Sequence, residues 1–395
     1  MSTHLSRRHL LATAVGGTAL GVVGCLDTAS EEAANWPTYG YDAGNSGYAP
    51  DVRGPTDNAE VAWTADLDAS RARSPIVYDD RIYVGTNWGV QSKLQQGHVV
   101  ALDREGNEQW RYLADRSIDG PLTATEDGVY GGTENGMVVA LDHEGERRWR
   151  YDLGSDNDAH VIATSGKVYA TSWEAGLLAL DTAGDRLWEH QAETAPAIGG
   201  MPIVGDDGIY VNGKSLYAIG TDGEKNWIYD PDELKVLDPI FAEGTVFTVE
   251  GPSEGSRGER LGNRHVAAFD TAGTVEWHKH VPDSGGRSVA DGSLLVSTSD
   301  ALVALDAATG DRQWECACSW PEAPSVAGDV AYIATIGGQV HAVGAATGEG
   351  LWQLDLEERI LSQPAISGGT VYVATEDGKL HALEESETSL SLSTR

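Results

Sequence analysis

Residues 129–153 read VYGGTENGMVVALDHEGERRWRYDL, and related units recur along the chain. The unit holds a short apolar run with Tyr, a second apolar run ending in Ala-Leu-Asp, a turn with Gly, and a run with Trp. Self-similarity of short alternating segments with regular turns is typical of repeat proteins built from small β-sheets. The second apolar run returns eight times, at residues 99–103, 138–142, 177–181, 216–220, 266–270, 302–306, 340–344 and 380–384.

A Trp follows each of the first seven of these runs at a nearly fixed distance, whereas none follows the eighth. An additional Trp63 precedes the first unit, in the segment VAWTADL (61–67). The eight runs and eight Trp match only if the N-terminal strand completes the last unit, which closes the array into a ring without open sheet edges. We expect these Trp to pack between neighbouring units: Trp63, Trp110, Trp149, Trp188, Trp227, Trp277, Trp314 and Trp352.

Each unit is predicted to form four antiparallel strands, and we name them A to D from the axis outward. Strand A follows a Pro, as at Pro75; strand B carries Val/Ile-Tyr; strand C is the Ala-Leu-Asp run; strand D carries the Trp. Asp followed by Gly is turn chemistry, because Asp accepts backbone hydrogen bonds and Gly takes a positive φ. The predicted fold is therefore all-β, an eight-bladed β-propeller of four-stranded antiparallel blades, closed by an N-terminal strand that completes the last blade.

The turn and Trp spacing resembles the tryptophan-docking motif of the pyrroloquinoline-quinone (PQQ) type of propeller, most closely at Asp306-Ala-Ala-Thr-Gly-Asp-Arg-Gln-Trp314. The opening segment WPTYGYDAGNSGYAP (36–50) also resembles the lead-in of such domains. The resemblance covers residues 36–384. It departs at Gly220 and Gly344, where Asp is expected, and this puts the shape of those two turns in doubt.

The N-terminal segment 1–24 resembles a twin-arginine signal peptide, with Arg7-Arg8 before an uncharged run too short to span a bilayer. Val22-Val23-Gly24-Cys25 resembles a lipobox, which implies lipidation of Cys25. The small and acidic residues 25–35 are predicted to form a tether, and the polar residues 385–395 a disordered tail. We therefore expect an exported protein, anchored by lipid to the outer face of the cell membrane.

The chain carries 61 acidic and 27 basic residues, for a formal net charge of −34. Such a surface disfavours nucleic acid as a partner, because phosphate contacts need clustered Lys and Arg. An acidic coat of this density also favours adaptation to a salty environment, since charges repel one another little when salt screens them.

The strand order predicts one variable face of the ring, which carries the B–C turns and the D–A connections. The D–A connections lead to the innermost strands, so their polar residues are expected to rim the central channel and to bind a ligand or partner. Arginines among them are suited to an anion or carboxylate, although hydrated loops without a ligand remain an alternative. The predicted rim residues are Arg71, Arg73, Asp119, His160, Asp238, Arg287, Glu322 and Gln363.

Three Trp lie outside the docking series and on or near this variable face: Trp88, Trp173 and Trp320. Exposed aromatic residues of this kind anchor protein partners in many interfaces, and packing beneath a loop is the alternative.

The resemblance implies two functions, of which we favour the first because the chain lacks an adjacent Cys pair. One is a non-catalytic interaction scaffold similar to the lipid-anchored BamB-type propellers, with an unidentified protein partner, no cofactor, no metal and no catalytic residue. The alternative is a divergent PQQ-dependent alcohol or sugar dehydrogenase with PQQ and Ca²⁺; the chain lacks the adjacent Cys pair of those enzymes. Cys316 and Cys318, in a predicted outer strand, are interpreted as buried thiols or as a strained disulfide. A metal site is the third interpretation, and it is disfavoured because two Cys supply too few ligands.

Overall fold

The computed structural model describes residues 35–87, 96–118, 120–164, 166–173, 175–191, 198–232, 234–252 and 262–386. The predicted signal peptide, Cys25, the tether up to residue 34 and the tail beyond residue 386 lie outside the described residues, as do Trp88 and Asp119. Among the residues that are described, no helix has both the length and the apolar character needed to span a membrane.

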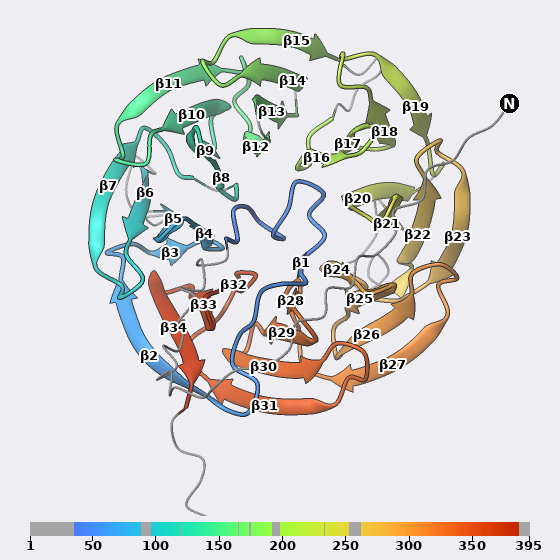
Figure 1. The fold of residues 1–395 in the computed structure, drawn as a ribbon. Helices are drawn as coiled ribbons and strands as arrows, with labels where there is room; N and C mark the ends of the chain where they lie inside the picture. Colours follow the sequence, from blue (N-terminus) through green and yellow to red (C-terminus); the bar gives the residue numbers. More distant parts are fainter. Residues whose placement is uncertain are drawn as a thin grey trace, which may run out of the picture. The chain divides into compact units, whose positions relative to one another are not determined.

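The described strands form eight antiparallel sheets arranged as blades around one axis (Figure 1). Blade 1 contains β4 (Ile76–Tyr78), β5 (Arg81–Asn87), β6 (Gly97–Leu102) and β7 (Glu108–Ala114). Blade 2 contains β8 (Thr123–Thr125), β9 (Gly128–Gly132), β10 (Met137–Leu141) and β11 (Arg147–Asp152). Blade 3 contains β12 (His160–Thr164), β13 (Lys167–Ser172), β14 (Gly176–Asp181) and β15 (Arg186–His190). Blade 4 contains β16 (Ile203–Gly205), β17 (Gly208–Asn212), β18 (Leu216–Ile219) and β19 (Lys225–Tyr229).

The second half of the ring repeats this order. Blade 5 contains β20 (Leu234–Ala242), β21 (Thr245–Pro252), β22 (His265–Asp270) and β23 (Val275–His280). Blade 6 contains β24 (Arg287–Ala290), β25 (Ser293–Ser297), β26 (Ala301–Asp306) and β27 (Arg312–Ala317). Blade 7 contains β28 (Ser325–Ala327), β29 (Val330–Ala334), β30 (Gln339–Gly344) and β31 (Gly350–Asp355). Blade 8 contains β32 (Ala365–Ser367), β33 (Thr370–Ala374), β34 (Lys379–Glu385) and β2 (Ala59–Asp66).

Blade 8 confirms the predicted closure, because its outer strand comes from the N-terminal part of the chain. Strand β2 pairs antiparallel with β34, with Trp63 opposite Ala382. The Glu385 carboxylate accepts hydrogen bonds from the backbone N–H groups of Thr56 and Asp57, at 2.7 and 3.0 Å, and this holds the approach to β2. Two sequence-distant segments thus form one blade, and the ring is closed by main-chain hydrogen bonds.

The Trp side chains dock each blade onto the next. Trp149 of blade 2 donates a hydrogen bond from Nε1 to the Thr182 carbonyl in the C–D turn of blade 3, at 2.9 Å. Its ring lies against Gly184 of the same turn, where an added Cβ would come within 2.7 Å of the ring. The equivalent Nε1 bonds, 2.8–3.0 Å long, join Trp63 to Arg104, Trp110 to His143, Trp188 to Thr221, Trp227 to Thr271, Trp277 to Ala307 and Trp352 to Pro55. The bond to Pro55 shows that the approach to β2 takes the place of a C–D turn in blade 8.

Trp314 of blade 6 departs from this pattern. Its ring lies against Gly348 of the next turn, but its Nε1 has no hydrogen-bond partner among the described residues. In the other blades an aromatic ring of strand B lies 5.8–6.1 Å from the Trp ring, whereas blade 6 has Leu295 at this position. The blade 6 to blade 7 junction is therefore held by packing without the polar contact of the other junctions.

The turns at Gly220 and Gly344 keep the backbone pattern of the Asp-containing turns. Gly223 N donates to Gly220 O at 2.9 Å, as Gly145 N donates to Asp142 O at 3.1 Å in the regular turn of blade 2. Neighbouring side chains replace the missing carboxylate: Asp222 accepts from Glu224 N, and Thr347 accepts from Glu349 N. The departure from the family pattern therefore leaves the shape of both turns unchanged.

The lead-in, residues 36–49, crosses the axis of the ring, where the sequence had predicted an open channel (Figure 1). Its main chain forms hydrogen bonds with the innermost strands of six blades. Trp36 exchanges two bonds with Val77, at 2.7 and 2.8 Å. The other lead-in carbonyls accept from strands β8, β16, β20, β24 and β28, in the pairs Pro37–Ala124, Ala43–Val204, Gly44–Phe241, Ser46–Val289 and Gly47–Val326. The short strand β1 (Tyr48–Ala49) pairs in parallel with β28, and β3 (Arg71–Ala72) pairs with β5.

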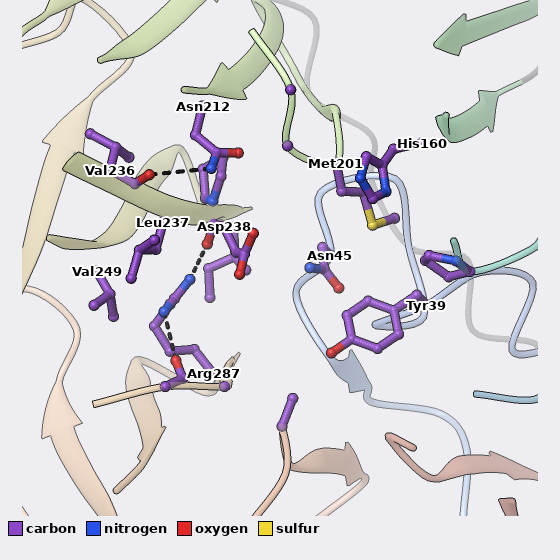
Figure 2. Close-up of a pocket in the computed structure, with 18 of the residues that line it drawn as sticks. Tyr39, Asn45, His160, Met201, Asn212, Val236, Leu237, Asp238, Val249 and Arg287 are labelled. Atoms are coloured by element: carbon purple, nitrogen blue, oxygen red, sulfur yellow. Dashed lines mark hydrogen bonds between the residues drawn. The ribbon is translucent and has the colours of Figure 1, made fainter. Parts of the chain in front are cut away.

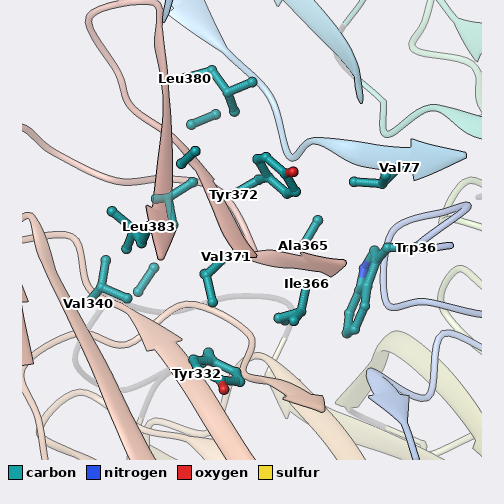
Figure 3. Close-up of a cluster of buried hydrophobic side chains, with 14 of the residues drawn as sticks. Trp36, Val77, Tyr332, Val340, Ala365, Ile366, Val371, Tyr372, Leu380 and Leu383 are labelled. Atoms are coloured by element: carbon teal, nitrogen blue, oxygen red, sulfur yellow. The ribbon is translucent and has the colours of Figure 1, made fainter. Parts of the chain in front are cut away.

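A hydrophobic core lies where the ring is closed. One cluster of buried apolar side chains joins the lead-in to blades 7, 8 and 1 (Figure 3). Trp36, only 1% exposed, packs in this cluster together with Val77, Ile366 and Tyr332. Burial of such large aromatic surfaces is the main favourable term in folding, so the lead-in and the closing blade share one hydrophobic core.

The two kinds of Trp junction are expected to differ in stability. Trp149→Phe removes a hydrogen bond and leaves the Thr182 carbonyl without its donor, whereas Trp314→Phe removes an N–H that has no described partner. We expect Trp149→Phe to lower the free energy of unfolding by about 1 kcal/mol more than Trp314→Phe. Denaturant midpoints measured by circular dichroism in high salt check this, and equal losses would contradict the described contacts.

The close approach of the lead-in to blade 5 is expected to tolerate no side chain at Gly44. A Cβ there would lie 2.4 Å from the Phe241 carbonyl oxygen. We expect Gly44→Ala to destabilise the protein by about 1–3 kcal/mol, as overpacking does. Gly350→Ala is the matched control, because no atom lies within 4 Å of an added Cβ at this strand position. The thermal midpoints of the two variants are measured and compared. Equal midpoints would contradict the described path of the lead-in across the axis.

Candidate functional site

A cavity of about 630 Å³ lies on the axis, on the face that carries the D–A connections and B–C turns. The lead-in supplies Tyr39 and Asn45 to its lining, and the remaining residues come from connections and strands around the ring. Figure 2 shows Tyr39, Asn45 and His160 on one side of the cavity, with Asp238 and Arg287 on the other. Because the lead-in crosses the axis, this cavity is bounded by main chain that is itself bonded to six blades.

The structure brings four of the eight predicted rim residues together in this cavity: Arg73, His160, Asp238 and Arg287. The other described rim residues have different surroundings. Arg71 forms an ion pair with Glu376 at 2.7 Å, and Gln363 is 4% exposed and donates from Nε2 to the Pro324 carbonyl at 2.9 Å. Glu322 does not line the cavity, and burial raises the pKa of its carboxyl group. Asp119, as stated above, lies outside the described residues.

Arg287, the first residue of β24, is the most deeply buried cation of the site, with 6% exposure. Its Nη1 donates to the Gly285 carbonyl at 2.7 Å, and its Nη2 donates to the main-chain carbonyl of Asp238. Burial lowers the pKa of the guanidinium to about 10, a shift that the nearby Asp238 charge partly opposes. Arg287 therefore stays positively charged at neutral pH, although it is removed from water.

Two further titratable groups face the cavity with altered acidity. Burial lowers the pKa of His160, and its Nδ1 has no hydrogen-bond partner among the described residues. Burial and the charges of Glu322 and Asp238 raise the pKa of the Tyr39 hydroxyl, so that it remains protonated. At neutral pH the cavity thus presents a neutral imidazole and a phenol beside the Arg287 charge.

Blade 5 supplies lining residues that the sequence interpretation missed, among them Lys235, Leu237 and Ile240. Its inner strand β20 has nine residues, longer than the other A strands, and its register with β21 is interrupted between Leu237 and Ile240. Asp238 takes a positive φ of 25° at this bulge, and bulges redirect side chains at functional edges. The long interval between Trp227 and Trp277 in the sequence was the available signal for this altered blade.

Of the three Trp predicted to lie on or near the variable face, the two described ones, Trp173 and Trp320, both lie on it. Trp173, which is 45% exposed, follows β13 and lines the cavity, with its ring against Gly199. Trp320, which is 43% exposed, lies in the D–A connection after β27. Its N–H donates to Ser299 O, its carbonyl accepts from Ile336 N, and its φ is 51°. Trp320 is therefore held in a backbone conformation that non-glycine residues rarely adopt.

The described residues include neither a cluster suited to a metal ion nor a thiol that lines the axial cavity. No group of three or more His, Cys, Asp or Glu there could hold a metal ion. Cys316 and Cys318 are free thiols packed between blades 6 and 7, and neither lines the axial cavity. Burial raises the pKa of Cys318 to about 12, so that its thiol stays protonated. These residues do not match the adjacent Cys pair implied by the dehydrogenase resemblance.

Comparison with solved structures shows the same propeller in proteins of different function. The chain resembles BamB from Moraxella catarrhalis with 17% identity and a TM-score of 0.65, covering 84% of this chain and 99% of that one. It resembles quinohemoprotein alcohol dehydrogenase from Comamonas testosteroni with 16% identity and a TM-score of 0.65, covering 91% and 82%. It also resembles the computationally designed Ika8 protein with 13% identity and a TM-score of 0.65, covering 83% and 99%. At these identities the likeness shows the fold alone.

Comparison with known sequences and family models is more selective than the likeness in fold. The search of curated proteins found no match. A family model described as outer membrane protein assembly factor BamB matches residues 95–315 and 299–390, which together span more than half of the chain. This match and the eight-bladed ring confirm the PQQ-type, BamB-like resemblance seen in the repeat. The chain belongs to the family of the outer membrane protein assembly factor BamB.

Proposed function

We propose that this protein is an exported, lipid-anchored propeller that acts at the outer face of the cell membrane as a non-catalytic scaffold, binding a protein partner. Export and anchoring rest on the Arg7-Arg8 signal and Cys25 of the sequence. The partner-binding role is supported by membership of the BamB family. We carry over the scaffold role and not the partner of the family, because we expect the partner to depend on the membrane in which the protein is anchored.

The observation that carries the proposal is the exposure of Trp173 and Trp320 on the face of the axial cavity. Large aromatic residues are enriched at the centres of interfaces, where they bury much apolar area at a small entropic cost. The main-chain hydrogen bonds of Trp320 fix its position before any partner arrives. A preorganised aromatic residue loses less freedom on binding, which favours affinity.

The test is cross-linking and affinity capture from native membranes, using the full-length protein. We expect one protein to be captured in stoichiometric amount, and the Trp173→Ala/Trp320→Ala variant to reduce its capture at least about tenfold. Leu113→Ala/Leu187→Ala is the matched control, because these residues are 52% and 48% exposed on the outer strands β7 and β15. Equal capture by all three proteins would place the partner on another surface.

The non-catalytic part of the proposal has its own measurement. The purified protein, mixed with PQQ and Ca²⁺ in high salt, is expected to show no saturable cofactor absorbance and no dye reduction with alcohols or glucose. Turnover in this assay would instead assign the protein to the dehydrogenase alternative.

A further inference from the structure

The axial cavity concentrates positive charge in an acidic protein. Its described lining contains one acidic residue, Asp238, against four basic ones. Over the whole chain the ratio is reversed, with 61 acidic and 27 basic residues. Clefts lined by one sign of charge between low-dielectric walls focus the field and raise the local concentration of ions of the opposite sign. The basic lining residues are Arg73, Lys235, Arg264 and Arg287.

Arg287 has no counter-charge in direct contact. With 6% exposure, it forms no ion pair with any described residue, and both of its described hydrogen bonds go to main-chain carbonyls. Its Nε has no hydrogen-bond partner in the described part of the chain. Buried charges in proteins are generally paired, because an isolated ion loses its hydration without compensation. Arg287 is a lining residue of the cavity, and only one N–H of each Nη is used by a described residue (Figure 2).

The rest of the lining suits an organic body rather than a bare ion. Figure 2 shows Leu237 and Val249 on the Arg287 side of the cavity, and Ile240 is a further apolar lining residue; of the three, Leu237 is partly exposed and the other two are buried. Tyr39 and Asn45 of the lead-in, together with Asn212, add neutral hydrogen-bonding groups. A volume of about 630 Å³ lies within the range of small-molecule sites, which are typically apolar with a few placed polar groups.

We propose that the axial cavity binds a small organic acid, whose carboxylate pairs with Arg287 and whose apolar body lies against the partly exposed Leu237. Each Nη of Arg287 keeps one N–H that no described residue uses, and a charge-assisted bond from it to a carboxylate is stronger than one between neutral groups. This site goes beyond the proposed scaffold role and does not depend on it: Trp173 lines the same cavity, but the proposed contacts are made by Arg287 and Leu237 and need no partner protein.

The first test compares acids with their neutral amides on the unmodified protein. Benzoate, phenylacetate and 2-naphthoate are measured by equilibrium dialysis against benzamide, phenylacetamide and 2-naphthamide. We expect at least one acid to saturate at one molecule per chain and to bind at least about tenfold more tightly than its amide. Absence of saturable binding by all three acids, or equal affinity of acid and amide, would overturn the proposal.

The second test assigns the binding to Arg287. We expect Arg287→Gln to abolish the preference for the acid while leaving the affinity for the amide within about twofold. Arg312→Gln is the control, because it removes the same charge from β27 of the same blade, where the side chain is 57% exposed. Circular dichroism shows whether each variant folds, and Arg287→Lys, which keeps the charge, is expected to keep part of the preference if Arg287→Gln does not fold.

Two outcomes of the second test count against the site. An equal loss in Arg312→Gln would attribute the acid preference to the overall charge of the protein. Complete displacement of the acid by an equal concentration of inorganic phosphate would show a site for simple anions only. Partner capture is measured separately with the Trp variants, so failure of this inference leaves the proposed scaffold function untouched.

Discussion

The pairing of β2 with β34 is the constraint on which the rest of the structure depends. It joins residues near the two ends of the described chain into one blade, with Trp63 opposite Ala382. Without it, blade 8 would have an open edge, Trp352 would lose its acceptor at Pro55, and Trp63 would not be held against the C–D turn of blade 1. The axial cavity also needs this pairing, because Arg73 and Leu361 line it from either side of the junction.

The fold was predictable because it rests on features that repeat. In most blades a turn exposes a carbonyl beside a Gly, and the Trp of the preceding blade donates a hydrogen bond to that carbonyl, as Trp149 does to Thr182. Both requirements fall on particular residue types at fixed spacing, so they are visible in a single sequence. Closure followed from the count of Trp63 against the Ala-Leu-Asp runs, since an unpaired edge is unfavourable.

The path of the lead-in was not predictable in the same way. Its hydrogen bonds to the innermost strands are made by main-chain atoms, such as the Gly44 carbonyl that accepts from Phe241, and such groups occur in every residue. The surroundings of individual rim residues were equally hidden. Arg71 meets Glu376 across the closure, and the direction of Asp238 depends on a local bulge in β20. Strand order predicted which face of the ring carries the site. Which residues line the cavity depends instead on contacts between blades that are distant in the sequence.

The lead-in also bears on the order in which the chain folds. Residues 36–49 form main-chain hydrogen bonds with strands from β4 to β28, and β2 pairs with β34. These contacts therefore span most of the sequence. Contacts of such long sequence separation form slowly, because a large loop must close before they contribute. During synthesis from the N-terminus, the lead-in is made first and acquires its last partners only when blade 8 is complete. The part of the propeller that is synthesised first is thus the last to be fixed in the fold.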